Sequence, residues 1–203
     1  MKNSILFKIF IVAVLLVIFS SCKTTDNNSY ISETQKSELE EFLSIFTIKP
    51  VLSNYTQEEE HALLYFTVYH LVELGDDRVK YDKQKNEYIV PKLAVDEKIE
   101  EYFGVEVDFS PYLGSTIRLK NEEYHFDDYF QSGAGYTKIE SVTKQGDEFF
   151  LTCYTTNSNG RRNNRPKEPV DGGPVLYNFT ALVAPHEYNG EKTWKLVELQ
   201  QIE

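Results

Sequence analysis

The fold of this chain is decided by the stretch VLYNFTALVAPHEYNGEKTWKLVELQQ, residues 175–201. It holds two runs with the composition of β-strands, residues 175–184 and 193–201, on either side of Asn189-Gly190. Asn-Gly between two such runs is the strongest short signal for a β-hairpin, because both residues accept the backbone of a tight turn. We therefore predict an antiparallel hairpin at this end of the chain.

Two more runs of the same kind precede it, residues 137–143 and 148–155, with Gln145-Gly146 between them. Together the four runs predict a four-strand antiparallel meander. The gap at residues 157–174 has Gly, Pro, Asn and charged residues without periodicity, so we expect a loop there. Residues 105–136 are aromatic and irregular, and we expect no regular element in them.

The first half of the chain has helical signals. Ser32 and Gln35 fit a capping box, and apolar residues then recur at helical spacing up to Phe46. Residues 62–74 are apolar on most sides, which predicts a central core helix, and Gly75 follows it. Thr56 fits a second capping box ahead of this helix.

A hairpin is expected from residues 79–82 and 87–90, and a third helix from residues 94–103, stopped by Gly104. The predicted fold class is α+β: two to three N-terminal helices packed on a curved antiparallel sheet with the C-terminal four-strand meander. The length fits one such domain, residues 31–203.

This order of elements resembles the cone-shaped nuclear-transport-factor-like fold, which SnoaL-like cyclases and ketosteroid isomerases share. A cystatin-like arrangement, with one helix across a curved sheet, is the near alternative. The resemblance implies a curved sheet that wraps a long helix and leaves a pocket at the wide end. It also implies that enzymes of this fold use a His or Asp that lines the cone. Fold alone does not assign a function.

The N-terminus has the pattern of an export signal: two lysines, an apolar run at residues 9–19, then Ser20, Ser21 and Cys22. The run is too short to cross a bilayer, which needs about 20 residues. The segment resembles a bacterial lipoprotein signal, although Phe19 stands where that family usually has an aliphatic residue. The resemblance implies a signal peptide at residues 1–21, an acylated Cys22 and a flexible tether up to residue 30. The domain would then be anchored at the cell membrane, facing the periplasm or the extracellular space.

Without residues 1–21, the chain has 19 basic and 32 acidic residues, a formal charge of −13. Such a surface disfavours nucleic acid and anionic lipid, so the acyl chains would have to supply the anchor. Cys153 would have no disulfide partner if Cys22 is acylated, and its apolar run favours a buried thiol over a nucleophile. No cofactor is indicated, and the oligomeric state is open.

The four histidines give no metal motif, and we predict no metal site. His61 and His70 are nine residues apart, which places them on opposite faces of one helix. His125 and Asp127 could share a strand face, as ordinary polar residues also do. His70 is a candidate for acid–base catalysis, beside Tyr65 and Tyr69. The alternative is a buried neutral histidine bonded to a tyrosine.

Two surface candidates remain. The first is an aromatic and acidic segment, which is a candidate pocket lid or partner surface. The alternative is that its rings close the core. Its residues are Tyr124, His125, Phe126, Tyr129, Phe130 and Tyr136. A basic loop could contact an anionic envelope polymer or an acidic protein, and the alternative is a solvated loop; its charges are Arg161, Arg162, Arg165 and Lys167.

The hypothesis that these features favour is a lipid-anchored extracytoplasmic binding module without catalytic activity, facing an envelope protein, a peptide or a small ligand. The first alternative is a small hydrolase, isomerase or cyclase that uses His70. The second is an inhibitor or immunity lipoprotein that acts on a cell-wall enzyme through its acidic surface.

Overall fold

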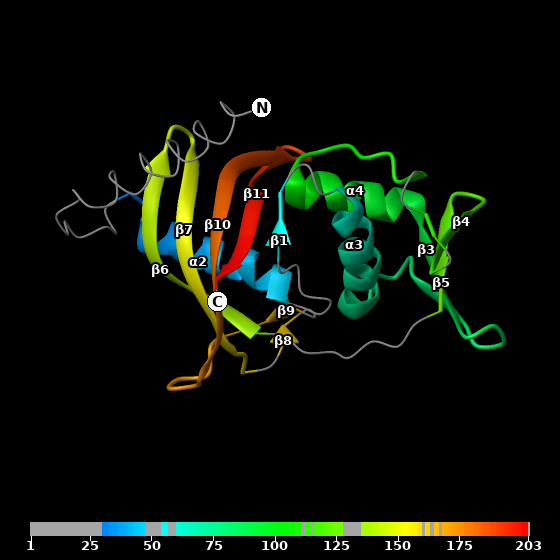
Figure 1. Ribbon diagram of the computed structural model, residues 1–203, viewed down its shortest axis with the longest axis horizontal. Helices are drawn as coiled ribbons and strands as arrows, with labels where there is room; N and C mark the ends of the chain where they lie inside the picture. Colours follow the sequence, from blue (N-terminus) through cyan, green and yellow to red (C-terminus); the bar gives the residue numbers. More distant parts are fainter. Residues whose placement is uncertain are drawn as a thin grey trace, which may run out of the picture.

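The computed structural model describes residues 30–47, 54–56, 60–110, 113–114, 116–127, 135–159, 161–162, 165–166 and 168–202. It confirms the α+β class: helices lie between a five-stranded and a four-stranded antiparallel sheet. Figure 1 shows the larger sheet at one end of the molecule, the smaller sheet at the other, and helices α3 and α4 between them. Cys22 and the predicted signal peptide lie outside the described residues.

The larger sheet contains the predicted meander. Its strand order is β1-β11-β10-β7-β6, and all neighbours are antiparallel. The strands are β1 (Asn54–Tyr55), β6 (Gly135–Gln145), β7 (Glu148–Asn157), β10 (Val175–Tyr188) and β11 (Glu191–Ile202). Asn189 and Gly190 form the β10–β11 turn with positive φ of 51° and 79°. Register shifts mark bulges with one extra residue, at Glu140 of β6, Leu176 of β10 and Val197 of β11. Bulges bend a sheet, and the bend of β10 is visible in Figure 1.

Three helices supply much of the core: α2 and α4 pack on this sheet, and α3 packs on α4. They are α2 (Glu33–Ser44), which continues into the 3₁₀ turn η1 (Ile45–Thr47), α3 (Glu60–Leu74) and α4 (Lys92–Phe103). The Ser32–Gln35 capping box is present, and Gly104 ends α4 with a φ of 62°. Helix α3 is the central core helix, as predicted, because nearly every side chain from Leu63 to Leu71 is buried. None of the helices in the described part of the chain has the length and apolar character to span a bilayer.

The smaller sheet corrects one prediction. Residues 105–136, expected to be irregular, contain the hairpin β4 (Ile117–Lys120) and β5 (Glu123–Phe126). It joins the predicted hairpin, β2 (Lys80–Asp82) and β3 (Glu87–Pro91), in the order β2-β3-β5-β4. The turn residues Asn121 and Glu122 both have positive φ, 50° and 60°, as a type I′ turn requires. Glutamate is rare in that conformation, so the sequence carried no turn signal there.

The loop at residues 157–174 also has more structure than expected. A short ribbon of β8 (Arg161–Arg162) and β9 (Arg165–Pro166) lies in it, and Ser158 pairs with Pro169. The backbone of the predicted basic loop is therefore a small hairpin rather than an open loop. The side chains of its arginines, and Lys167 as a whole, lie outside the described residues.

Helix α2 closes the free edge of the larger sheet, which the sequence did not indicate. Strand β6 is the last strand of that sheet, and three side chains of α2–η1 bind its outward backbone groups. The Ile139 N–H donates to Glu40 Oε1 (3.0 Å), and the Thr137 N–H donates to Ser44 Oγ (2.8 Å). At the end of the strand, Thr47 Oγ1 accepts from the Gly135 N–H (3.1 Å) and donates to its C=O (2.7 Å). This edge is thus occupied and does not offer a template for pairing with another chain.

Candidate binding pocket

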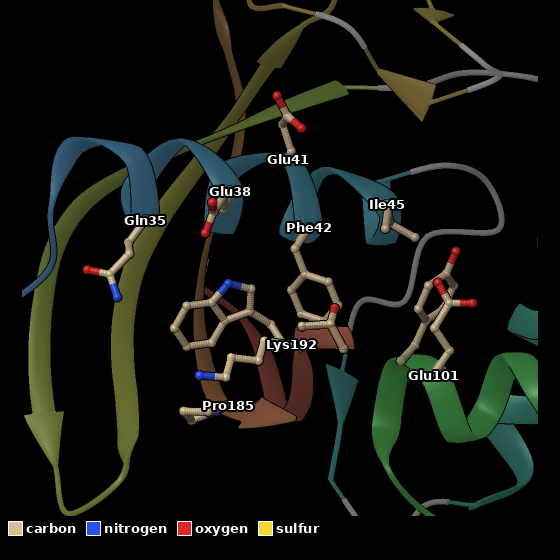
Figure 2. A pocket seen from close by; sticks show the side chains of 11 residues that line it. Gln35, Glu38, Glu41, Phe42, Ile45, Glu101, Pro185 and Lys192 are labelled. Carbon is tan, nitrogen blue, oxygen red and sulfur yellow. The ribbon is translucent and has the colours of Figure 1, made fainter. Parts of the chain in front are cut away.

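A pocket of about 470 Å³ opens between α2, the C-terminal half of α4 and the β10–β11 hairpin. Figure 2 shows side chains from all three elements converging on it. The lining residues are Gln35, Glu38, Glu41, Phe42, Ile45, Glu101, Tyr102, Pro185, Lys192, Thr193 and Trp194. The volume lies within the range of sites for small molecules.

Local structure explains why these elements meet there. The His186 Nε2–H of β10 donates to the Glu100 carbonyl of α4 at 3.0 Å, which ties the hairpin to the helix. The end of α4 also approaches β11 closely at Gly104, where an added Cβ would lie 2.7 Å from Lys195 Cδ. Glycine is favoured there by the positive φ, whereas the long side chain of Lys195 could move aside for a Cβ. The two walls of the pocket are held together by these contacts.

The floor of the pocket is aromatic. Phe42 and Tyr102 are buried and meet edge to face, with ring centroids 6.5 Å apart and planes at 76°. Trp194 is half-buried and is held by Phe149, with a centroid distance of 5.6 Å and planes at 81°. Trp194 is the single tryptophan of the chain, so its fluorescence reports on this pocket alone.

The rim of the pocket carries more acidic than basic groups. Its lining has three glutamates and one lysine, and Glu38, Glu41 and Lys192 are exposed. Glu101 is paired with Lys98, whose Nζ also lies 5.1 Å from the centre of the Tyr102 ring. Figure 2 shows Glu38 and Lys192 on the same side of α2. No described residue forms an ion pair with Glu38, so its carboxylate is available to a ligand.

Such a lining is suited to binding a cation. Aromatic faces attract cations that lie above them, and a carboxylate beside them adds to that attraction. The lining contains no histidine or cysteine, and Thr193 supplies a hydroxyl group. An apolar group that carries a positive charge matches this combination of surfaces.

His70 lies behind the pocket and does not line it. Its side chain is 1% exposed, its ring stacks on Phe66 with centroids 5.1 Å apart, and its Nε2 is 3.4 Å from the Tyr102 hydroxyl. The tyrosine within hydrogen-bonding distance of His70 is thus Tyr102 on α4, and Tyr65 and Tyr69 lie beside His70 only in sequence. Neighbours in sequence on a helix point about 100° apart, and Tyr69 stacks with Tyr65 and contacts Phe126 instead.

Strand alternation separates the residues of the aromatic and acidic segment. Tyr124 and Phe126 are 1% and 0% exposed and face the core, where burial raises the pKa of Tyr124. Tyr136 is buried on β6, which raises its pKa to about 12. Tyr129 and Phe130 lie outside the described residues. The described rings of this segment close the core instead of forming one surface.

His125 faces the other side of the smaller sheet, in a charged cluster. Its Nδ1 is 3.0 Å from Glu87 Oε2, and Arg118 donates to Glu87 Oε1 (2.6 Å) and to Asp127 (3.1 Å). Hydrogen bonds from His125 and then Arg118 lower the pKa of Glu87. Among the described residues, no group of three His, Cys, Asp or Glu side chains could hold a metal ion.

Cys153 is fully buried on β7, and burial raises the pKa of its thiol. A thiol in that state is a poor nucleophile, in agreement with the interpretation drawn from its apolar run. Comparison of the chain with protein-family models, with curated proteins and with solved structures gives no match.

Proposed function

We propose that this protein is a lipid-anchored extracytoplasmic binding module, and that the pocket between α2, α4 and the β10–β11 hairpin takes a small amphipathic ligand with a cationic group. The observation that carries the proposal is the aromatic floor of Phe42, Tyr102 and Trp194 beneath an acidic rim. The pocket has no nucleophile paired with a base, which favours binding over catalysis.

The location is proposed from the sequence. The resemblance of residues 1–22 to a lipoprotein signal supports acylation of Cys22, and the polar residues 23–29 would serve as a tether. Cells fed labelled palmitate should incorporate the label into the wild-type protein, which should be recovered in the membrane fraction. Cys22→Ser should abolish both the labelling and the recovery in the membrane fraction. An unmodified thiol at Cys22, or the intact 203-residue chain in the cytosol, would refute the anchor.

The pocket can be tested with a pair of small probes of opposite charge. All residues of the described hydrophobic core fall between Ile31 and Leu199 in the sequence. A chain that begins at Lys23 therefore keeps the core and lacks only the acylated cysteine and the signal peptide. Phenylethylamine should change the fluorescence of Trp194 saturably, whereas phenylpropionate should not, because only the amine is attracted to the rim. Equal responses to both probes, or to neither, would refute a cation-selective pocket.

A matched pair of variants locates the effect. Glu38→Gln removes a rim carboxylate and should weaken amine binding about 2–5-fold, the range for one exposed charge. Glu140→Gln removes the same charge from an exposed position on β6, outside the pocket, and should leave the affinity unchanged. Equal effects of the two substitutions would mean that only the net charge matters.

One contact supports the enzymatic alternative. Tyr102 both lines the pocket and lies 3.4 Å from His70, so a proton could pass between a ligand and His70 through the tyrosine. A cone-fold enzyme of this kind would lose turnover with Tyr102→Phe, while binding would remain. The order of helices, first hairpin and C-terminal meander, with the second hairpin β4–β5 inserted before the meander, is what supports the resemblance to the nuclear-transport-factor-like fold.

A further inference from the structure

The five residues after α4 have the pattern of a β-strand but belong to neither sheet. In residues 105–109, Val-Glu-Val-Asp-Phe, apolar and acidic side chains alternate. Val105 and Val107 are half-buried against the core and Phe109 is 2% exposed, whereas Glu106 and Asp108 are exposed. Figure 1 shows this stretch of the chain returning along α4 after the helix ends.

The backbone of this segment has no hydrogen-bonded partner among the described residues. Residues 105–108 form no backbone–backbone hydrogen bond with any other described residue, and no strand of the described sheets is their neighbour. An extended segment directs its N–H and C=O groups sideways, perpendicular to its alternating side chains. Unpaired groups in such a row are a template for another strand. Five residues is also an ordinary length for a strand.

A groove of about 640 Å³ runs between this segment and α4. Leu93 on its helical side is 66% exposed, the most exposed large apolar side chain among the described residues. Two of the acids in its lining are already paired, Asp96 with Lys92 and Glu97 with Arg78. Glu100, Glu106 and Asp108 form no ion pair with a described residue, so the groove carries an excess of negative charge. Hydrogen bonds from Ser110 lower the pKa of Asp108 and keep its carboxylate ionised.

We propose that residues 105–109 are a docking edge at which an extended, basic peptide segment of a partner protein adds as a strand. The main chain of the peptide would supply the hydrogen bonds that the segment lacks, and its side chains would supply the specificity. This site lies on the far side of α4 from the aromatic pocket and does not depend on the function proposed for that pocket.

The geometry of paired strands specifies the sequence of the peptide. Side chains directly opposite on two paired strands lie on the same face. Lysine or arginine at alternate positions would therefore lie beside Glu106 and Asp108, and the residue between them would point inward, as Val107 does. An apolar residue at that position would meet the apolar lining of the groove.

The test uses three peptides of equal length, labelled for fluorescence anisotropy, with the chain from Lys23. The first is acetyl-Thr-Lys-Val-Lys-Val-Thr-amide, and the second has Glu in place of both Lys. The third retains the lysines but has N-methyl groups on alternate backbone amides, so it has the charge without the hydrogen-bond donors. The first should bind, while the second and third should bind at least about tenfold more weakly.

Charge reversal in the protein gives the converse experiment. Glu106→Lys with Asp108→Lys should weaken the lysine peptide at least about fivefold and strengthen the glutamate peptide, since both side chains are exposed and the fold should persist. Glu140→Lys with Glu148→Lys is the control, with equal charge change on β6 and β7. Circular dichroism and an unchanged emission spectrum of Trp194 would show that the variants are folded.

Three results would overturn the proposal. Equal binding of the N-methylated and unmodified lysine peptides would mean that charge alone is responsible. Equal effects of the two double variants would place the peptide elsewhere. Concentration-dependent dimers that the Glu106 and Asp108 variant disperses would show that the edge pairs with a second copy of this chain instead.

Discussion

Glu40 allows the strongest quantitative test of how this fold is held together. Its side chain is 6% exposed and binds two groups of the edge strand β6: the Ile139 N–H at 3.0 Å and the Lys138 ammonium at 2.9 Å. Glu40→Ala removes both acceptors. Glu40→Gln keeps an oxygen for the Ile139 amide and removes only the charge. The difference between the two variants therefore measures the contact that covers the strand edge.

The expected sizes follow from the burial of each partner. The Ile139 amide would lose its acceptor, which costs about 1–3 kcal/mol for a buried donor. Lys138 is 35% exposed, so its ion pair adds at most about 1 kcal/mol. Glu40→Ala should thus lower the free energy of unfolding by about 1–4 kcal/mol, and Glu40→Gln by at most about 1 kcal/mol. For a domain of this size, Glu40→Ala corresponds to a decrease in Tm of roughly 2–15 °C.

Urea denaturation followed by circular dichroism, with thermal unfolding alongside, measures both variants. Glu41→Ala is the control, because Glu41 is the next residue of the same helix and is exposed. It should change the free energy of unfolding by less than about 0.5 kcal/mol. If Glu40→Ala and Glu40→Gln were equally destabilising, the backbone contact would contribute nothing. If neither differed from Glu41→Ala, the account of the covered edge would be wrong.

Three further predictions concern other parts of the fold. A carboxyl group whose pKa is lowered by folding stabilises the folded state at pH values above its ordinary pKa, which is 4.5 for Glu87. This contribution is lost as the pH falls through the lowered pKa of the folded state. The wild type should therefore lose stability more steeply below pH 4.5 than Glu87→Gln, and parallel urea titrations would contradict this. His70→Ala should lower the free energy of unfolding by about 2–4 kcal/mol, because the ring is packed in the core; an unchanged Tm with lost turnover would instead assign His70 to catalysis. Glu122→Gly should raise Tm by about 2–3 °C, since the turn holds a φ of 60°, whereas Glu123→Gly in β5 should lower it; a lower Tm for both would argue against the turn geometry.

Much of the fold could be predicted because its signals are local. The β10–β11 turn needs only Asn189 and Gly190, and the start of α2 needs only Ser32 and Gln35, so short windows of sequence contain the whole physical cause. The β4–β5 hairpin was missed because its turn places Glu122 in a left-handed conformation, which propensity does not indicate. In that hairpin, pairing with β3 outweighs the preference of a single residue.

The pocket could not be predicted in the same way, because no local pattern contains it. Its floor combines Phe42 from the first described helix, Tyr102 from the end of α4 and Trp194 from the last strand. Within its own helix or strand, each of these residues has the pattern of an ordinary core aromatic. The pocket arises only because the β10–β11 hairpin docks on α4 and leaves one side of the three rings accessible to a ligand. The single tryptophan was the one available signal, since a large ring near the end of a strand can be only partly buried. The segment at residues 105–109 is a different case, because its alternation of apolar and acidic residues is local in the sequence, yet no regular element was predicted there. What only the three-dimensional structure adds is that no described strand lies beside it. A strand pattern with no described neighbour is a conflict between local and global structure, and such conflicts in natural proteins are expected at functional or strained sites.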